Sequence, residues 1–151
     1  MFYLLGTVFL IIAGILLFPV PVSLIYGELQ MLPSFLIPAA ISGLLGITFR
    51  KKFEQKELLL GNAMVLVAIS WTLLSAFGAI PYIFGINLGI LDAFFESVAG
   101  FTATGLTVLQ GAAGWTVEVP PHSLLFWRSL TQWVGGVGVI VLFLAIIPRA
   151  G

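Results

Sequence analysis

The chain has 151 residues, of which 60% are hydrophobic and only 8% charged, and its formal net charge is zero. Soluble domains carry about 25% charged residues, so this composition excludes an ordinary soluble domain and indicates a membrane protein, and the few Lys and Arg residues provide no basic surface for nucleic acid. Cysteine is absent and His122 is the only histidine, which excludes disulfides, thiolate metal sites and a histidine-based zinc cluster.

Four apolar stretches are each long enough for a membrane-spanning helix of about 20 residues. The predicted helices lie in residues 1–27, 29–49, 58–80 and 123–147. Pro19 and Pro21 are expected to end the first helix, and Pro81 the third, because proline lacks the N–H that continues a helix. We interpret the first stretch as an uncleaved span, with a cleaved secretion signal as the alternative, because it is long and no charge precedes Glu28.

The charges orient these helices. If all four span the membrane, five of the six basic residues fall on one side: Arg50, Lys51, Lys52, Lys56 and Arg149. The positive-inside rule makes this side, with the link between the second and third helices, cytoplasmic. Four of the six acidic residues then lie on the outer side: Glu28, Asp92, Glu96 and Glu118. The sequence therefore predicts an acidic outer face.

The segment between the third and fourth helices is unusual for an external loop. Residues 91–100 predict a helix, with Asp92 as its N-cap and Gly100 as its stop. Ten residues give about 15 Å of helix, which is half the hydrocarbon thickness. A Thr/Gly segment and a Gly/Pro-rich return over residues 111–121 follow. Because non-helical backbone at membrane depth is tolerated only where protein buries it or it lines a water-filled path, the pattern predicts a re-entrant pore loop.

We name residues 102–105, Thr102-Ala103-Thr104-Gly105, the filter segment. An ion at membrane depth exchanges its hydration shell for other oxygens, and the carbonyls of an extended backbone supply them. Thr102 and Thr104 add hydroxyls, and Gly105 is able to adopt a positive φ. The half-length helix would direct the partial negative charge of its C-terminus toward the ion.

Three charged residues are candidates for supporting roles, each with a structural alternative. Asp92 and Glu96 would concentrate cations at the mouth of a pore, or else cap and hydrogen-bond the half-length helix. Arg128 lies near the outer end of a membrane helix, where an ionisable residue indicates function; the alternatives are snorkelling to the interface and pairing with a neighbouring loop carboxylate. The glycines of the fourth helix favour close packing over bending, and the tryptophans indicate interface anchors or packing.

Two longer motifs resemble a known family. Residues 92–109, DAFFESVAGFTATGLTVL, resemble the first pore loop and filter of the Trk/Ktr/HKT superfamily of potassium transporters, especially its TrkH branch. Residues 126–142, FWRSLTQWVGGVGVIVL, resemble the helix that follows in that family. The resemblance implies that the carbonyls of Thr102, Ala103, Thr104 and Gly105 coordinate potassium. Glycine rather than serine at Gly105 favours potassium over sodium by the same resemblance.

The family carries four helix–pore loop–helix repeats around one pore. The resemblance therefore implies an N-terminal helix pair with a basic cytoplasmic link in residues 1–57 and the first repeat in residues 58–151. The expected fold is an all-α membrane protein with four transmembrane helices, one re-entrant pore helix and a filter loop. This length would supply one quarter of a selectivity filter.

The resemblance implies potassium uptake by a multi-pass subunit of the cell membrane, with potassium as the transported ion and no cofactor. The expected partners are the lipid bilayer, the remaining repeats or further copies of the chain in a homo-oligomer, and a cytosolic nucleotide-binding regulatory subunit. An enzyme is not expected, because the spans hold no paired carboxylates or nucleophile–base set. The alternatives are a non-conducting scaffold piece from a truncated gene and a homotetrameric cation channel.

Overall fold

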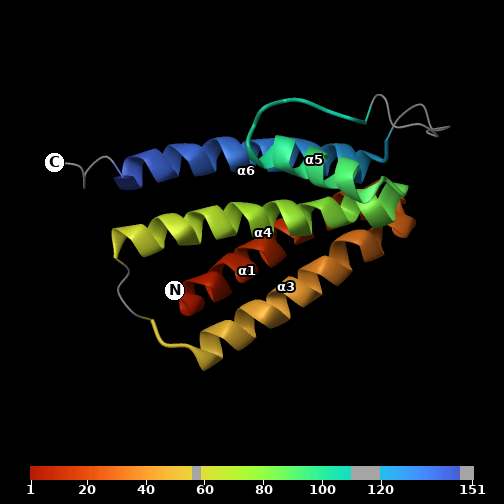
Figure 1. Ribbon diagram of the computed structural model, residues 1–151. Helices are drawn as coiled ribbons and strands as arrows, with labels where there is room; N and C mark the ends of the chain where they lie inside the picture. Colours follow the sequence, from red (N-terminus) through yellow and green to blue (C-terminus); the bar gives the residue numbers. More distant parts are fainter. Residues whose placement is uncertain (56–58, 110–119, 147–151) are drawn as a thin grey trace.

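The computed structural model describes residues 1–55, 59–109 and 120–146, and over these ranges the chain is helical (Figure 1). The elements in chain order are α1 (Phe2–Leu17), α2 (Pro19–Ile25), the 3-10 helix η1 (Leu29–Met31), α3 (Leu32–Lys52), α4 (Leu60–Ile86), α5 (Ile90–Phe101) and α6 (His122–Ile146). Within these described ranges, three segments are long and apolar enough to cross a membrane: Phe2–Ile25, Leu29–Lys52 and Gly61–Ile86. The prediction of an all-helical membrane protein is confirmed.

The charged ends of the helices lie at opposite ends of the bundle. The last turn of α3, which carries Arg50, Lys51 and Lys52, lies at the end where α4 begins, whereas the α2–η1 turn lies at the end where α4 stops and α5 starts (Figure 1). The other predicted members of the two charged faces, Lys56, Glu118 and Arg149, lie outside the described residues, as does most of the Gly/Pro-rich return.

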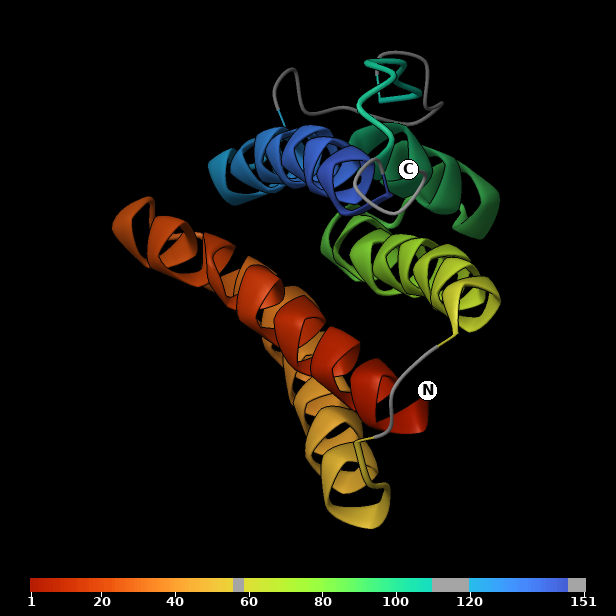
Figure 2. The ribbon, with the colours of Figure 1, turned by 90° about the vertical axis from the view of Figure 1, so that its left-hand side faces the viewer.

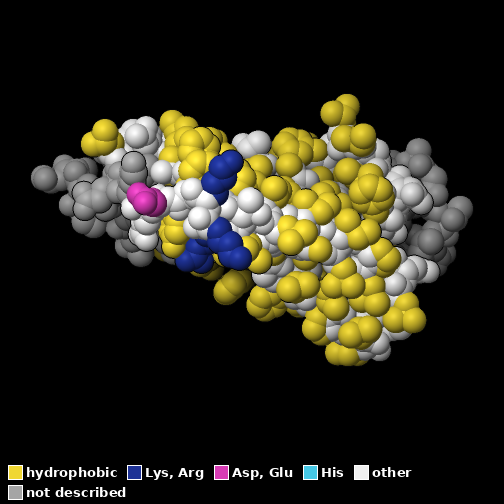
Figure 3. Space-filling model, turned by 90° about the horizontal axis from the view of Figure 1, so that it is seen from below, with side chains coloured by type: hydrophobic (Ala, Val, Ile, Leu, Met, Phe, Trp, Pro, Cys, Tyr) yellow, Lys and Arg dark blue, Asp and Glu magenta, His cyan; other side chains and the backbone are white. Residues whose placement is uncertain are grey.

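The side of α3 that is not packed against other helices is apolar. Its exposed side chains include Ile37, Ile41 and Leu44, which are 58%, 48% and 67% accessible and follow each other at helical spacing. From below, the molecule shows a broad hydrophobic surface on which the Lys and Arg side chains gather in one region (Figure 3). A continuous apolar surface of this kind is expected where helices face lipid.

The helices form two groups in Figure 2, with α1 and α3 in one and α4, α5 and α6 in the other. Within the first group, small residues allow close contact: a Cβ added at Gly46 would lie 2.8 Å from the Gly6 carbonyl oxygen. Ser42 also donates a hydrogen bond to the Phe9 carbonyl, with an Oγ–O distance of 2.7 Å. The two groups meet where Phe35 packs edge-on against Trp127, with ring centroids 6.0 Å apart.

Two of the predicted helix ends depended on prolines. α1 ends at Leu17 before Pro19, as expected. Pro19 then occupies the first turn of α2, where a proline costs no hydrogen bond because N–H groups at this position have no partner within the helix. The predicted end of the third helix at Pro81 is wrong, because α4 continues through Pro81 to Ile86 and ends at Asn87, whose φ is 53°.

α4 is packed closely by its neighbours in the turn before Pro81. Pro81 removes the N–H that would bond to the carbonyl of Phe77, four residues earlier. Next to it, the Gly78 carbonyl accepts a buried hydrogen bond from Trp127 Nε1 at 3.1 Å, and a Cβ added at Gly78 would overlap Ser97 and Phe101 of α5. Packing against neighbouring helices allows a membrane helix to continue through a proline.

Glu28 caps the start of α6 from the distant α2–η1 turn. Its carboxylate accepts hydrogen bonds from the backbone N–H groups of His122 and Ser123, at 2.6 and 3.0 Å, and from the Ser123 hydroxyl. The His122 ring stacks on Tyr26 with centroids 4.0 Å apart. A carboxylate at a helix N-terminus satisfies unpaired N–H groups and complements the helix dipole. The N-terminal helices are therefore fastened to α6 by charge and hydrogen bonding.

The Glu28 cap predicts acid sensitivity. Partial burial raises the pKa of Glu28, but the hydrogen bonds from Ser123 and His122 together outweigh it, so the pKa lies below its ordinary value of 4.5. The cap therefore contributes its full stability above pH 4.5 and loses it as the pH falls through the folded-state pKa. At pH 7 we expect Glu28→Gln to lower the free energy of unfolding by about 1 kcal/mol.

Thermal unfolding in detergent between pH 7 and pH 3 tests the cap. The difference between Glu28→Gln and the unchanged protein should shrink below pH 4.5. Glu54→Gln, at an exposed residue beyond the end of α3, serves as the control and should have no effect at pH 7. Equal stability of the Glu28 and Glu54 variants at pH 7 would contradict the assignment.

Candidate functional site

α5 is a half-length helix beside α4 and α6. Its 12 residues extend about 18 Å, and it starts at the end of the bundle where α4 stops (Figure 1). After α5 the chain turns and runs back toward the same end of the bundle. The predicted boundaries were off by one residue: the helix begins at Ile90 and includes Phe101.

The prediction that Asp92 is the N-cap of this helix is wrong. Gly89 occupies that position with extended backbone, at φ −56° and ψ 146°, and no side chain caps the helix there. Asp92 lies in the first turn, where its charge still complements the helix dipole, and its side chain is exposed.

A left-handed turn ends α5 and begins the filter segment. Ala103 has φ 54°, and its N–H donates to the Gly100 carbonyl at 2.9 Å, while the Thr104 N–H donates to the Ala99 carbonyl at 3.1 Å. This pair of hydrogen bonds is the Schellman pattern, which stops a helix and reverses the chain. The turn therefore places the filter segment directly at the C-terminal, partially negative end of α5.

The filter segment lies on the surface of the chain. All four of its residues are exposed, and Gly105 has φ 75° with no atom within 4 Å of an added Cβ. The two threonine hydroxyls donate to carbonyls of α5, from Thr102 to Val98 at 2.7 Å and from Thr104 to Ala99 at 3.3 Å. Their protons are directed into the helix, so the oxygen lone pairs and the backbone carbonyls are the groups that remain for an ion.

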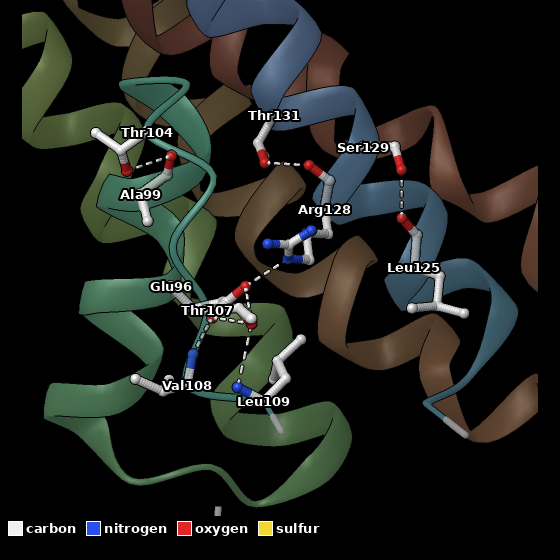
Figure 4. A network of polar contacts seen from close by, with 10 residues as sticks. All are labelled: Glu96, Ala99, Thr104, Thr107, Val108, Leu109, Leu125, Arg128, Ser129 and Thr131. Carbon is white, nitrogen blue, oxygen red and sulfur yellow. Dashed lines mark hydrogen bonds and ion pairs between the residues drawn. The ribbon is translucent and has the colours of Figure 1, made fainter. Parts of the chain in front are cut away.

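Glu96 connects α5 to the residues that follow the filter segment, and we name residues 106–109 the return segment. Its side chain is 1% exposed and accepts hydrogen bonds from the Thr107 hydroxyl, at 2.9 and 3.0 Å, and from the Val108 N–H at 3.0 Å (Figure 4). Arg128 Nε on α6 donates to the same carboxylate at 2.6 Å. The Leu109 N–H donates to the Thr107 hydroxyl oxygen, which completes the network.

This network joins three separate parts of the chain, α5, the return segment and α6, through one buried carboxylate. Charge-assisted hydrogen bonds are shorter and stronger than neutral ones, so Glu96 holds both neighbours firmly. The structure thus separates the two acidic candidates, since Asp92 is exposed and Glu96 is buried. Of the alternatives for Arg128, the structure shows pairing with a carboxylate of the predicted pore loop, because its partner Glu96 lies on the half-length helix α5.

The carbonyl of Phe101, the last residue of α5, is contacted from two helices. Trp71 Nε1 on α4 donates a hydrogen bond to it at 3.1 Å. On α6, a Cβ added at Gly135 would overlap the Phe101 carbonyl group, and one added at Gly138 would lie 3.0 Å from the Trp71 ring. The sequence predicts only an anchoring or packing role for Trp71, and no motif around it signals this contact.

A second close contact lies one residue earlier. A Cβ added at Gly100 would overlap the Thr131 hydroxyl of α6, and Thr131 is fully buried. By contrast, an added Cβ at Gly136 would meet nothing within 4 Å. The glycines of α5 and α6 at this junction therefore serve close helix packing. Within the described residues, no cluster of three or more His, Cys, Asp or Glu side chains is placed to hold a metal ion.

Comparison with known proteins supports the resemblance noted in the sequence. Residues 28–151 match the model of the family described as TrkH, cation transport protein. The chain is 38% identical over 151 residues to the Trk system potassium uptake protein TrkH of Escherichia coli K12, covering 97% of this chain and 30% of that protein. It is also 38% identical over 150 residues to an uncharacterised cation transporter of Methanocaldococcus jannaschii, covering 99% of this chain and 30% of that one.

The fold is shared as well. The crystal structure of the potassium transporter TrkH from Vibrio parahaemolyticus superimposes with a TM-score of 0.85 at 30% sequence identity, covering 97% of this chain and 31% of that one. The chain thus spans less than a third of the length of these relatives and corresponds to their N-terminal part. The resemblance predicted from residues 92–109 and 126–142 is confirmed: the chain belongs to the TrkH family of cation transport proteins.

Proposed function

We propose that this chain is the N-terminal part of a potassium uptake subunit and that Thr102, Ala103, Thr104 and Gly105 form one quarter of its selectivity filter. The observation that carries the proposal is the end of α5, where a half-length helix stops in a left-handed turn and presents an exposed, non-helical filter segment. Relatives of the chain are named as potassium uptake proteins, which supports potassium as the ion.

The exposure of this backbone argues for an ion path. In lipid every unsatisfied backbone N–H or C=O is unfavourable by several kcal/mol, so exposed irregular backbone at membrane depth must line a water-filled path or be covered by protein. Carbonyl oxygens in such a path replace the hydration shell of a potassium ion. The C-terminus of α5 adds a partial negative charge at the same place.

The proposed architecture follows the charges and the helix directions. Residues 1–57 form the N-terminal helix pair, and residues 58–151 form a repeat in which α4 and α6 span the membrane and α5 is the re-entrant pore helix. The end of α3 with Arg50, Lys51 and Lys52 faces the cytoplasm by the positive-inside rule. The exposed Asp92 then lies on the outer side, where its charge attracts cations toward the filter.

A complete filter requires more than this chain. The chain covers less than a third of its relatives, so the remaining three quarters come from further repeats or from further copies. We include a homo-oligomeric assembly and a cytosolic nucleotide-binding regulatory subunit in the proposal.

Potassium rescue of uptake-deficient cells tests the filter. We expect the chain completed with the remaining repeats to restore growth at low potassium, and Gly105→Arg to abolish it, because Gly105 has φ 75° and an arginine would place a cation on the path. Expression of the chain alone shows whether copies assemble a pore without further repeats.

The matched control is Gly27→Arg. Gly27 also has a positive φ, 69°, and open space around it, but it lies in the α2–η1 turn. It therefore reproduces the backbone strain and the added charge of Gly105→Arg away from the filter, and uptake should persist. If the completed transporter still restores growth with Gly105→Arg, the filter assignment fails.

A further inference from the structure

We propose that Trp71 is a positioning residue of the filter: its indole N–H fixes the Phe101 carbonyl and thereby sets where the filter begins. The inference rests on the proposed function, because it assigns a role within the same ion path. It concerns a residue on α4, thirty positions before Phe101, that acts on the filter segment through the Phe101 carbonyl.

The hydrogen bonds at the end of α5 identify Phe101 as the critical peptide group. The last four carbonyls of a helix lack partners within the helix. The turn after α5 supplies backbone donors to three of them, the carbonyls of Val98, Ala99 and Gly100. The fourth, the Phe101 carbonyl, accepts its hydrogen bond from Trp71 Nε1 at 3.1 Å. Trp71 therefore completes the C-terminus of α5.

α6 packs close to both the Trp71 indole and the Phe101 peptide group. Its ring lies close to α6, because a Cβ added at Gly138 would come within 3.0 Å of it. The Phe101 side chain is 1% exposed and packs edge-on against Trp127, with ring centroids 6.2 Å apart. The backbone of α6 at Gly135 closes the other side of the Phe101 carbonyl. Two helices thus fix one peptide group from different directions.

This geometry defines the first carbonyl that faces the path. The hydrogen bond directs the Phe101 carbonyl toward α4, and the exposed backbone begins at the next residue, Thr102. Discrimination between potassium and sodium depends on the number and the field of the coordinating carbonyls. Without the Trp71 hydrogen bond, the Phe101 carbonyl is free to turn toward the path. The number and the field of the coordinating carbonyls would then change, and the filter segment would become less rigid.

Trp71→Phe tests the inference in the completed transporter. Phenylalanine keeps an aromatic ring beside Gly138 but removes the N–H. In proteoliposomes we expect the ratio of sodium to potassium flux to rise about fivefold, the factor that corresponds to one ordinary hydrogen bond. The amount of folded protein, measured by size-exclusion chromatography, should remain close to that of the unchanged protein.

Trp133→Phe is the matched control. It makes the same chemical change on α6, where Trp133 is 67% exposed, and leaves the Trp71 hydrogen bond to Phe101 in place. The flux ratio should stay unchanged in this variant. Gly138→Ala is a second variant that displaces the Trp71 ring while keeping its N–H, and it should raise the flux ratio in the same direction.

The outcomes separate this inference from the proposed function. If Trp71→Phe and Gly138→Ala leave the flux ratio unchanged while Gly105→Arg blocks uptake, the filter stands and the role of Trp71 is refuted. An equal rise in Trp71→Phe and Trp133→Phe also refutes it, because loss of packing anywhere in the bundle would then explain the change in flux ratio. If Gly105→Arg permits uptake, the proposed function is refuted, and the role of Trp71 in the filter is refuted with it.

Discussion

Replacing Glu96 with alanine is expected to lower the free energy of unfolding by about 3 kcal/mol, near the lower end of the range measured for breaking buried ion pairs. The change leaves Arg128 without its carboxylate and removes the acceptor of the Thr107 hydroxyl and the Val108 N–H. The lower end applies because the Arg128 side chain is 23% exposed and reaches some water. Chemical unfolding in detergent measures the change.

Function should fail together with stability in this variant. The Glu96 carboxylate holds the return segment, so its loss releases the backbone directly after Gly105, and potassium uptake by the completed transporter should fall at least tenfold. The control is the double variant Glu96→Gln with Arg128→Gln, which removes both charges and keeps polar side chains of similar shape. It should unfold at a higher denaturant concentration than Glu96→Ala. A Glu96→Ala protein within 0.5 kcal/mol of the unchanged one would show that the pair contributes little.

Gly135→Ala is expected to separate α6 from the end of α5. The added Cβ would overlap the backbone of Phe101, and a backbone group cannot move aside as a flexible side chain does. Overpacking of this kind is unfavourable by about 1–3 kcal/mol. Because the displaced group directly precedes the filter segment, we also expect potassium uptake to be lost.

The neighbouring glycine supplies the control for this prediction. Gly136→Ala makes the same chemical change in the same helix, so any gain in helix propensity is equal, but its added Cβ meets nothing within 4 Å. The melting temperature of Gly136→Ala should equal or exceed that of the unchanged protein, and its uptake should match. Equal effects of the two substitutions would show that the contact between α6 and Phe101 is unimportant.

Hydrophobic stretches predicted the helices well because a helix that crosses lipid needs about 20 predominantly apolar residues in a row. The fourth predicted helix, residues 123–147, begins within one residue of α6, which starts at His122 and is described as far as Ile146. The half-length helix was located with similar accuracy, since it lies between a break after α4 and a Thr/Gly segment. The number and order of these elements follow from patterns local in sequence.

Predictions that relied on a single residue to mark a helix end or a helix start were wrong at two positions, Pro81 and Asp92. Pro81 reads as a helix end in sequence, yet α4 continues past it, and the Gly78 carbonyl in the preceding turn accepts a hydrogen bond from Trp127, which lies 49 residues after Gly78. Asp92 has the chemistry of an N-cap, but the backbone at Gly89 is already extended and starts the helix three residues earlier. Neither contact nor backbone angle is encoded in a local pattern.

The location of the candidate site could be predicted, but its supporting contacts could not. The filter segment lies at the end of the half-length helix because its Thr and Gly residues are poor helix formers there. Glu96 and Arg128, however, are 32 residues apart, and several carboxylates were available to Arg128. Trp71 and Trp127 look alike in sequence, and only the folded arrangement shows that one of them donates to Phe101.

The capping of α6 by Glu28 has a consequence for the biogenesis of the protein. Synthesis proceeds from the N-terminus, so the Glu28 carboxylate is made 94 residues before its first partner, His122. Until then it stays hydrated at the membrane surface. The arrival of α6 exchanges that water for two backbone N–H groups, so insertion of the last described helix secures the first helical hairpin.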